Sequence, residues 1–118
     1  MKNIQLTCAH ALIKYLIAQK TLIDGKKVPL FPGVFGIFGH GNVACLGQAL
    51  EENQKDLPTW RGHHEQNMAL TGIAYSRAKR RKQIFVATSS VGTGSTNMIT
   101  AAAVAMSNRI QILFLPGD

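Results

Sequence analysis

The chain has 118 residues, of which 46% are hydrophobic, and a formal net charge of +7 at pH 7. That length suits one domain with its own core, residues 1–118, and this hydrophobic content excludes a disordered chain. No apolar run reaches the roughly 18 residues of a membrane span, so we expect a cytoplasmic protein with no membrane partner.

The first predicted element is a helix over residues 6–17, because apolar residues recur there at helical spacing. Thr7 is the expected cap of this helix, since its hydroxyl can accept a hydrogen bond from the first turn. A turn at Asp24-Gly25 follows.

Strands and helices then alternate to the end of the chain. Strands are predicted over residues 34–38, 59–63, 84–87 and 110–115, with helices over 43–50, 65–79 and 98–106 between them. This spacing gives one βαβ unit per repeat and predicts an α/β fold, a three-layer αβα domain with a mainly parallel sheet. Because the chain stops as the fourth strand ends, we expect a piece of a longer, truncated domain.

The positive charge and the two cysteines have simple interpretations. Much of the charge lies in residues 77–82, at the end of a predicted helix, where the helix dipole favours cations. No aromatic residue interrupts that run to stack on bases, so no nucleic-acid partner is expected. Cys8 and Cys45 lack metal-ligand spacing, and we expect both to be reduced and buried. Trp60 and the methionines are also expected in the core.

Three loops are expected at one edge of the sheet, following the strands at Gly39, Glu65 and Gly92. Glycines let a ligand approach the backbone, and helix N-termini there present free N–H groups. A carboxylate beside two glycine-rich loops is typical of a cofactor site.

Other functions fit single motifs. Residues 39–44 match the dinucleotide pattern G-x-G-x-x-G/A, and Glu65 follows near the spacing of a ribose-binding acid. That alternative leaves the loop 92–94 without a role. Alternatively, both glycine loops are tight turns of a non-catalytic interaction domain. His40, His63 and His64 have no metal-binding spacing, so no metal ligand is predicted.

Several motifs together resemble one family. His64-Glu65-Gln66 with residues 74–77 resembles the glutamate segment of thiamine diphosphate enzymes of the acetolactate synthase and benzoylformate decarboxylase type. Residues 88–97 resemble the family's T-S-G-P-G-A-T-N loop, with Thr93 and Ser95 in place of Pro and Ala. Residues 115–118 resemble the end of its pyrimidine-binding domain.

The resemblance covers nearly the whole chain and implies an N-terminal pyrimidine-binding domain of an enzyme. Residues 34–44 and 46–52 are most similar to members that open a cyclic diketone by C–C bond hydrolysis in myo-inositol catabolism. The resemblance therefore implies a cyclic diketone substrate and a homo-oligomer, either a dimer or a tetramer. Another acetolactate synthase-like activity is the alternative.

The resemblance also implies roles for individual residues. Glu65 is the expected catalytic residue, because the family's glutamate hydrogen-bonds N1′ of the cofactor's aminopyrimidine ring and shares a proton with it. The other expected cofactor-binding residues are Gly39, Gly92, Gly94 and Asn97, and those expected to line the substrate cleft are His40, Gly41, Asn42 and Gln66. Asn97 is explained equally well as a helix cap.

The implied cofactor is thiamine diphosphate, with Mg²⁺ holding its diphosphate on a separate domain that carries a Gly-Asp-Gly segment. This chain contains no Gly-Asp-Gly, and we expect the metal ligands to lie on a domain absent from it. The chain alone is therefore expected to be inactive and to bind the cofactor poorly.

Overall fold

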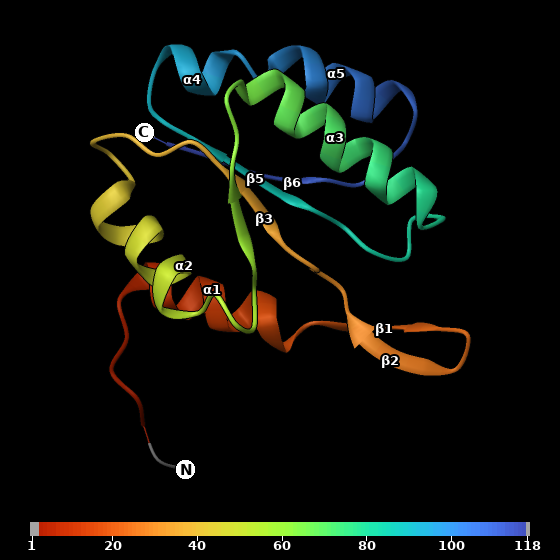
Figure 1. Ribbon diagram of the computed structural model, residues 1–118, viewed down its shortest axis with the longest axis horizontal. Coiled ribbons are helices and arrows are strands. Elements are labelled where there is room, and N and C mark those ends of the chain that lie inside the picture. The colour runs from red at the N-terminus through yellow and green to blue at the C-terminus, as the bar shows by residue number, and fades with distance from the viewer. Residues whose placement is uncertain (1–2, 118) are drawn as a thin grey trace.

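The computed structural model describes residues 3–117 and is built around a parallel sheet of strand order β4-β3-β5-β6 (Figure 1). The strands are β3 (Val34–Gly36), β4 (Thr59–Arg61), β5 (Val86–Ser89) and β6 (Leu113–Pro116). One face is covered by α1 (Cys8–Ala18) and α2 (Gln48–Glu52), and the other by α3 (Glu65–Ala78), α4 (Thr93–Thr96) and α5 (Ile99–Ser107). The prediction of a three-layer α/β fold with a parallel sheet is confirmed.

The core consists of two apolar clusters, one on each face of the sheet. Val86 belongs to the cluster under α1 and α2, and its neighbour Ala87 to the cluster under α3 and α5. Both residues are fully buried, and so is the rest of β5. A strand buried on both faces is typical of the centre of a parallel sheet.

The helix α1 begins as its cap predicts. Thr7 is extended, and its side chain accepts a hydrogen bond from the backbone N–H of His10 at 3.2 Å. Since the N-cap residue lies outside the helix, α1 starts at Cys8, two residues later than predicted.

Helices α1 and α2 are joined by a polar contact. His10 Nε2 lies 2.8 Å from Glu52 Oε2, and Gln48 donates to the other carboxyl oxygen of Glu52 at 3.0 Å. The hydrogen bond from His10, followed by that from Gln48, lowers the pKa of the Glu52 carboxyl below its ordinary value.

A β-hairpin precedes the sheet, and the sequence predicted only its turn. Strands β1 (Lys20–Ile23) and β2 (Lys26–Pro29) pair antiparallel around Asp24 and Gly25, whose φ angles are 49° and 76°. Two successive residues with positive φ form the tight turn that matches the twist of a hairpin. The hairpin projects from the rest of the fold (Figure 1).

Two strands begin later than predicted. β5 starts at Val86 because Ile84 is tied to the end of the hairpin, donating its N–H to Leu30 O at 2.9 Å. β6 starts at Leu113 because Ile110 still closes α5, donating its N–H to Ala105 O at 2.9 Å.

The helix predicted after Asn42 starts as a π-helix, η1 (Val43–Gly47), before it becomes α2. The wider turn changes the angular spacing of side chains. Val43 and Leu50 therefore do not share a face: Val43 is 52% exposed, whereas Leu50 is buried.

Four residues expected in the core lie at the surface instead. Cys8 and Cys45 are both exposed, the former in the first turn of α1 and the latter in η1. Trp60 stays half exposed because β4 is an edge strand, although its ring packs 5.9 Å from that of Phe35. Met106 is exposed on α5. No helix in the described part of the chain is both long and apolar enough to cross a membrane.

Candidate functional site

The loops that follow β3, β4 and β5 meet around the side chain of Ser90. A Cβ added to Gly39 would lie 2.7 Å from Ser90 Cβ, so the two loops are in direct contact. Gly94 packs against the same serine, and a Cβ added to Gly94 would lie 3.0 Å from Glu65 Oε1. The structure thus brings Gly39, Gly94 and Glu65 to one place at the carboxyl edge of the sheet.

Glu65 is the first residue of α3 and is partly buried. Its Oε2 accepts a hydrogen bond from Asn97 Nδ2 at 2.9 Å, whereas Oε1 receives none from the described residues. The N-terminal end of the helix dipole stabilises a carboxylate here by about 0.3–1 kcal/mol. One carboxyl oxygen is therefore held by the protein, and the other is left beside the bare backbone of Gly94.

Asn97 connects the glycine-rich loop to the glutamate. It occupies the C-cap position of α4, yet its side chain leaves the helix end and reaches Glu65. The same amide nitrogen lies 3.4 Å from His64 Nε2. The sequence left open a cap and a site residue; Asn97 is the C-cap of α4, and its side chain also lies beside Glu65.

The ring of His64 contacts both the first turn of α3 and the Asn97 amide. As N-cap of α3, His64 accepts the Asn67 N–H through Nδ1 at 3.4 Å, which leaves the proton on Nε2. Nε2–H and the Asn97 NH₂ group are both donors and do not satisfy each other.

Asn42 holds the first glycine loop on the sheet. It is 7% exposed, its Oδ1 accepts the Gly39 N–H at 3.0 Å, and its Nδ2 donates to Ser89 O at 2.7 Å and to Thr88 Oγ1 at 3.3 Å. Both amide donors are used within the protein. The expected substrate contact of Asn42 therefore does not come from its amide hydrogens, because this side chain positions the loop.

The remaining predicted residues lie around this centre. His40 and Gly41 are exposed in the loop after β3, and Gln66 is half-buried in the first turn of α3. Gly92 caps α4 with φ 61° and ψ −115°, a conformation that only glycine adopts readily. Among residues 3–117 no three His, Cys, Asp or Glu side chains are grouped so that they could hold a metal ion.

Sequence reasoning missed how the second glycine loop is fixed. Ser95 Oγ lies 2.9 Å from Ser90 O and 2.8 Å from Gly117 O, and so ties the loop to the end of β6. Ser95 stands where the resembled family has alanine, and that departure was the available signal. A groove of about 380 Å³ opens beside it, lined by residues that include Gly41, Cys45, Leu115 and Gly117.

Residues 32–118 match the family described as the N-terminal TPP binding domain of thiamine pyrophosphate enzymes. Over 118 residues, the chain is 51% identical to a 3D-(3,5/4)-trihydroxycyclohexane-1,2-dione hydrolase of Clostridium tetani and 52% identical to one of Geobacillus thermodenitrificans. A protein of the same name from Bacillus anthracis is 51% identical. Each match covers the whole chain but only 18% of the relative's length. The chain belongs to the family of N-terminal cofactor-binding domains of thiamine pyrophosphate enzymes.

Proposed function

We propose that this chain holds the aminopyrimidine ring of thiamine diphosphate in a hydrolase that opens trihydroxycyclohexane-1,2-dione by cleaving a C–C bond in inositol catabolism. The observation that carries the site is the Glu65 carboxyl, held through Oε2 by Asn97 with Oε1 beside Gly94. The identity of about half of all residues to hydrolases of that name supports the substrate.

The residues around Glu65 fit a flat heterocycle. A Cβ on Gly94 would overlap Ser90 Oγ and lie 3.0 Å from Oε1, so only glycine lets this loop pack directly against the glutamate. Gly92, exposed at the loop tip, leaves its backbone equally open. When bound, thiamine diphosphate supplies an electron sink for breaking a bond next to a carbonyl group.

The chain's own residues then hold and move one proton. Glu65 Oε1 would share a proton with a nitrogen of the bound aminopyrimidine ring, while Oε2 would keep its contact with Asn97. Because that proton lies on Oε1, Oε2 stays an acceptor, and Asn97 Nδ2 would donate to it whether the carboxyl is ionised or protonated. Asn97 and His64 act through Glu65 and are positioning residues.

We also propose that Mg²⁺ and the diphosphate are held by parts of the protein outside these 118 residues. The absence of Gly-Asp-Gly from the chain and the greater length of its relatives support this division. The working enzyme is then a cytoplasmic homo-oligomer, a dimer or a tetramer, in which Glu65 meets a cofactor anchored elsewhere.

Turnover of the cyclic diketone by the whole enzyme tests the proposal. Glu65→Gln keeps the size of the side chain but removes its titrating proton, and should lower kcat by orders of magnitude. Glu51→Gln, which changes an exposed glutamate of α2, is the matched control and should retain activity. Normal turnover in Glu65→Gln would refute the site. An enzyme that cleaves or condenses pyruvate but leaves the diketone intact would refute the substrate alone.

A further inference from the structure

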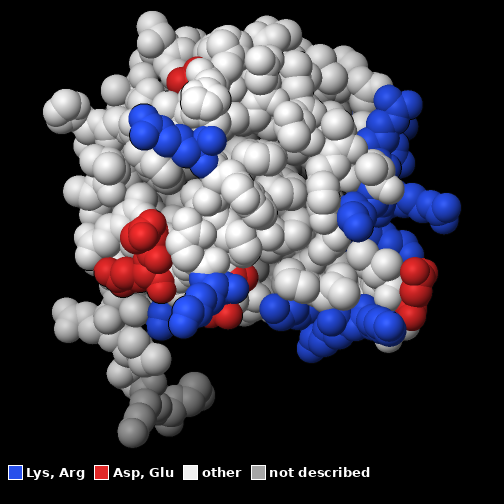
Figure 2. Space-filling model, in the orientation of Figure 1, with Lys and Arg blue, Asp and Glu red and all other residues white. Residues whose placement is uncertain are grey.

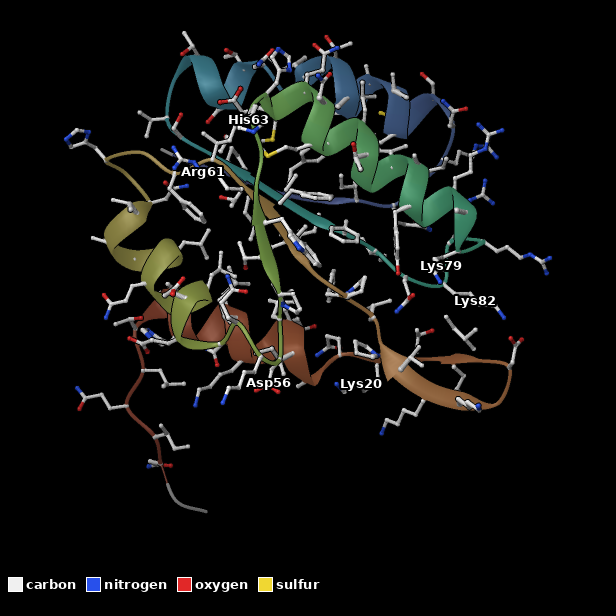
Figure 3. All side chains as sticks on the ribbon, viewed as in Figure 1. Lys20, Asp56, Arg61, His63, Lys79 and Lys82 are labelled. Atoms are coloured by element: carbon white, nitrogen blue, oxygen red, sulfur yellow. The ribbon has the colours of Figure 1, made fainter. Side chains whose placement is uncertain are left out.

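Positive charge gathers at the opposite end of α3 from Glu65. Arg77, Lys79, Arg80, Arg81 and Lys82 lie in or directly after the last turn of α3, and Figure 2 shows Lys and Arg side chains crowded on that side of the molecule. Lys79 and Lys82 lie there beside the loop that leaves α3 (Figure 3). A helix of 14 residues is about 21 Å long, so this basic end is distinct from the Glu65 site.

Arginines occupy backbone positions there that favour glycine. Arg80 and Arg109 follow the C-caps of α3 and α5, both with φ 53°, and Arg81 has φ 63°. The Arg81 N–H donates to Ser76 O at 2.8 Å, which closes the usual left-handed ending of a helix. Glycine takes this conformation without strain, so the arginines add charged side chains at a cost in backbone energy.

A pocket opens between the ends of α3 and α5. It has a volume of about 350 Å³ and is lined by Arg77, Arg80, Arg81, Asn108 and Ile110, with no carboxylate among them. Arg81 Nη2 lies 3.4 Å from Asn108 O, which holds this guanidinium group across the gap between the helices. The one ion pair among the described residues, His10–Glu52, lies elsewhere.

The pocket carries an excess of positive charge. Three arginines line it, and the C-terminal ends of two helices each contribute about half a negative charge. About two positive charges therefore remain, close to the charge of about −1.5 to −2 that a phosphate monoester carries at pH 7. Capping of the two helices accounts for only part of the cationic charge.

We propose that this pocket binds the phosphate or diphosphate group of a small molecule. The planar guanidinium groups of Arg77, Arg80 and Arg81 can each present two N–H donors to phosphate oxygens. The volume lies in the range of small-ligand sites, about 300–1,000 Å³. No aromatic side chain lines the pocket to stack on a base, which argues against single-stranded nucleic acid.

Calorimetric titration of the chain with inorganic pyrophosphate, in sulfate-free buffer at about 0.15 M salt, tests the proposal. Arg80→Gly removes a lining guanidinium, and Arg109→Gly removes an arginine from the equivalent backbone position outside the pocket lining. Both variants should fold, because glycine suits φ 53°. Arg80→Gly should weaken binding by about tenfold or more, as expected for a lost hydrogen bond to a charged group. Arg109→Gly should keep the affinity within about twofold.

Three results would overturn the proposal. The first is the lack of saturable binding to the unmodified chain. The second is equal weakening by Arg80→Gly and Arg109→Gly, which would indicate a diffuse attraction that single-stranded RNA would also exploit. The third is weaker pyrophosphate binding in Glu65→Gln, which would place the anion at the other end of α3. Retained binding in Glu65→Gln supports the pocket, whatever the fate of the proposed reaction.

Discussion

Replacing Asn42 by alanine tests how the first glycine loop is held. The substitution removes three buried or partly buried hydrogen bonds and leaves the Gly39 N–H without its partner, while Ser89 O keeps a bond from Gly117 at 3.0 Å. At about 0.5–1.5 kcal/mol for each bond, Asn42→Ala should lower the free energy of unfolding by about 2–4 kcal/mol. In a domain of this size that loss lowers the melting temperature by roughly 8–15 °C.

Urea unfolding of the chain measures this loss of free energy. If the slope of the free energy against urea concentration is unchanged, the folded and unfolded states have kept their compactness. Asn67→Ala is the matched control, because Asn67 is an exposed residue of α3 whose side chain makes no hydrogen bond with the described residues. It should change the free energy of unfolding by less than about 0.5 kcal/mol. If Asn42→Ala unfolds at the same urea concentration as Asn67→Ala, the side chain does not position the loop and is free for a substrate.

Two further predictions concern the glycine loop and the acid stability. Gly92→Ala should lower the free energy of unfolding by about 1–3 kcal/mol, because Gly92 has a positive φ, and should leave the Glu65 carboxyl in place. Gly94→Ala should also displace Glu65 and so weaken cofactor binding by the whole enzyme. Denaturation and cofactor titration of both variants separate the two effects, and equal cofactor affinity in the two variants would contradict this prediction. Because the folded pKa of Glu52 is lowered, its contribution to stability is present above the unfolded value of 4.5 and is lost as pH falls through the folded pKa. In unfolding experiments below pH 4.5, Glu52→Gln should lose this part of the acid sensitivity, and an unchanged pH profile would contradict the role of the His10 contact.

The parallel sheet was predictable because each strand and helix is encoded locally. The strands β3, β4, β5 and β6 start at residues 34, 59, 86 and 113, at intervals of 25 to 27 residues, and a helical pattern fills each gap. The cap at Thr7 and the turn at Asp24 and Gly25 are also short-range signals, and both are found.

The contacts that build the site were not predictable in the same way. Asn42 bonds to a strand 46 and 47 residues further along the chain, and Ser95 to a residue 22 positions away. Such partners become visible only when the sheet order is known. The π-helix η1 was missed because its apolar spacing fits an ordinary helix equally well. The pocket between the ends of α3 and α5 was not predicted, because residues 77–82 considered alone indicate only a solvated helix end.

The Glu65 carboxyl and its proton are central to the proposed function. Exchange of the thiazolium C2 hydrogen of thiamine diphosphate with deuterium, followed by proton NMR in the whole enzyme, reports on that proton without depending on the substrate. We predict that Glu65→Gln slows the exchange by orders of magnitude, whereas Glu51→Gln leaves it unchanged. Exchange in Glu65→Gln as fast as in the unmodified enzyme would contradict the assignment of Glu65.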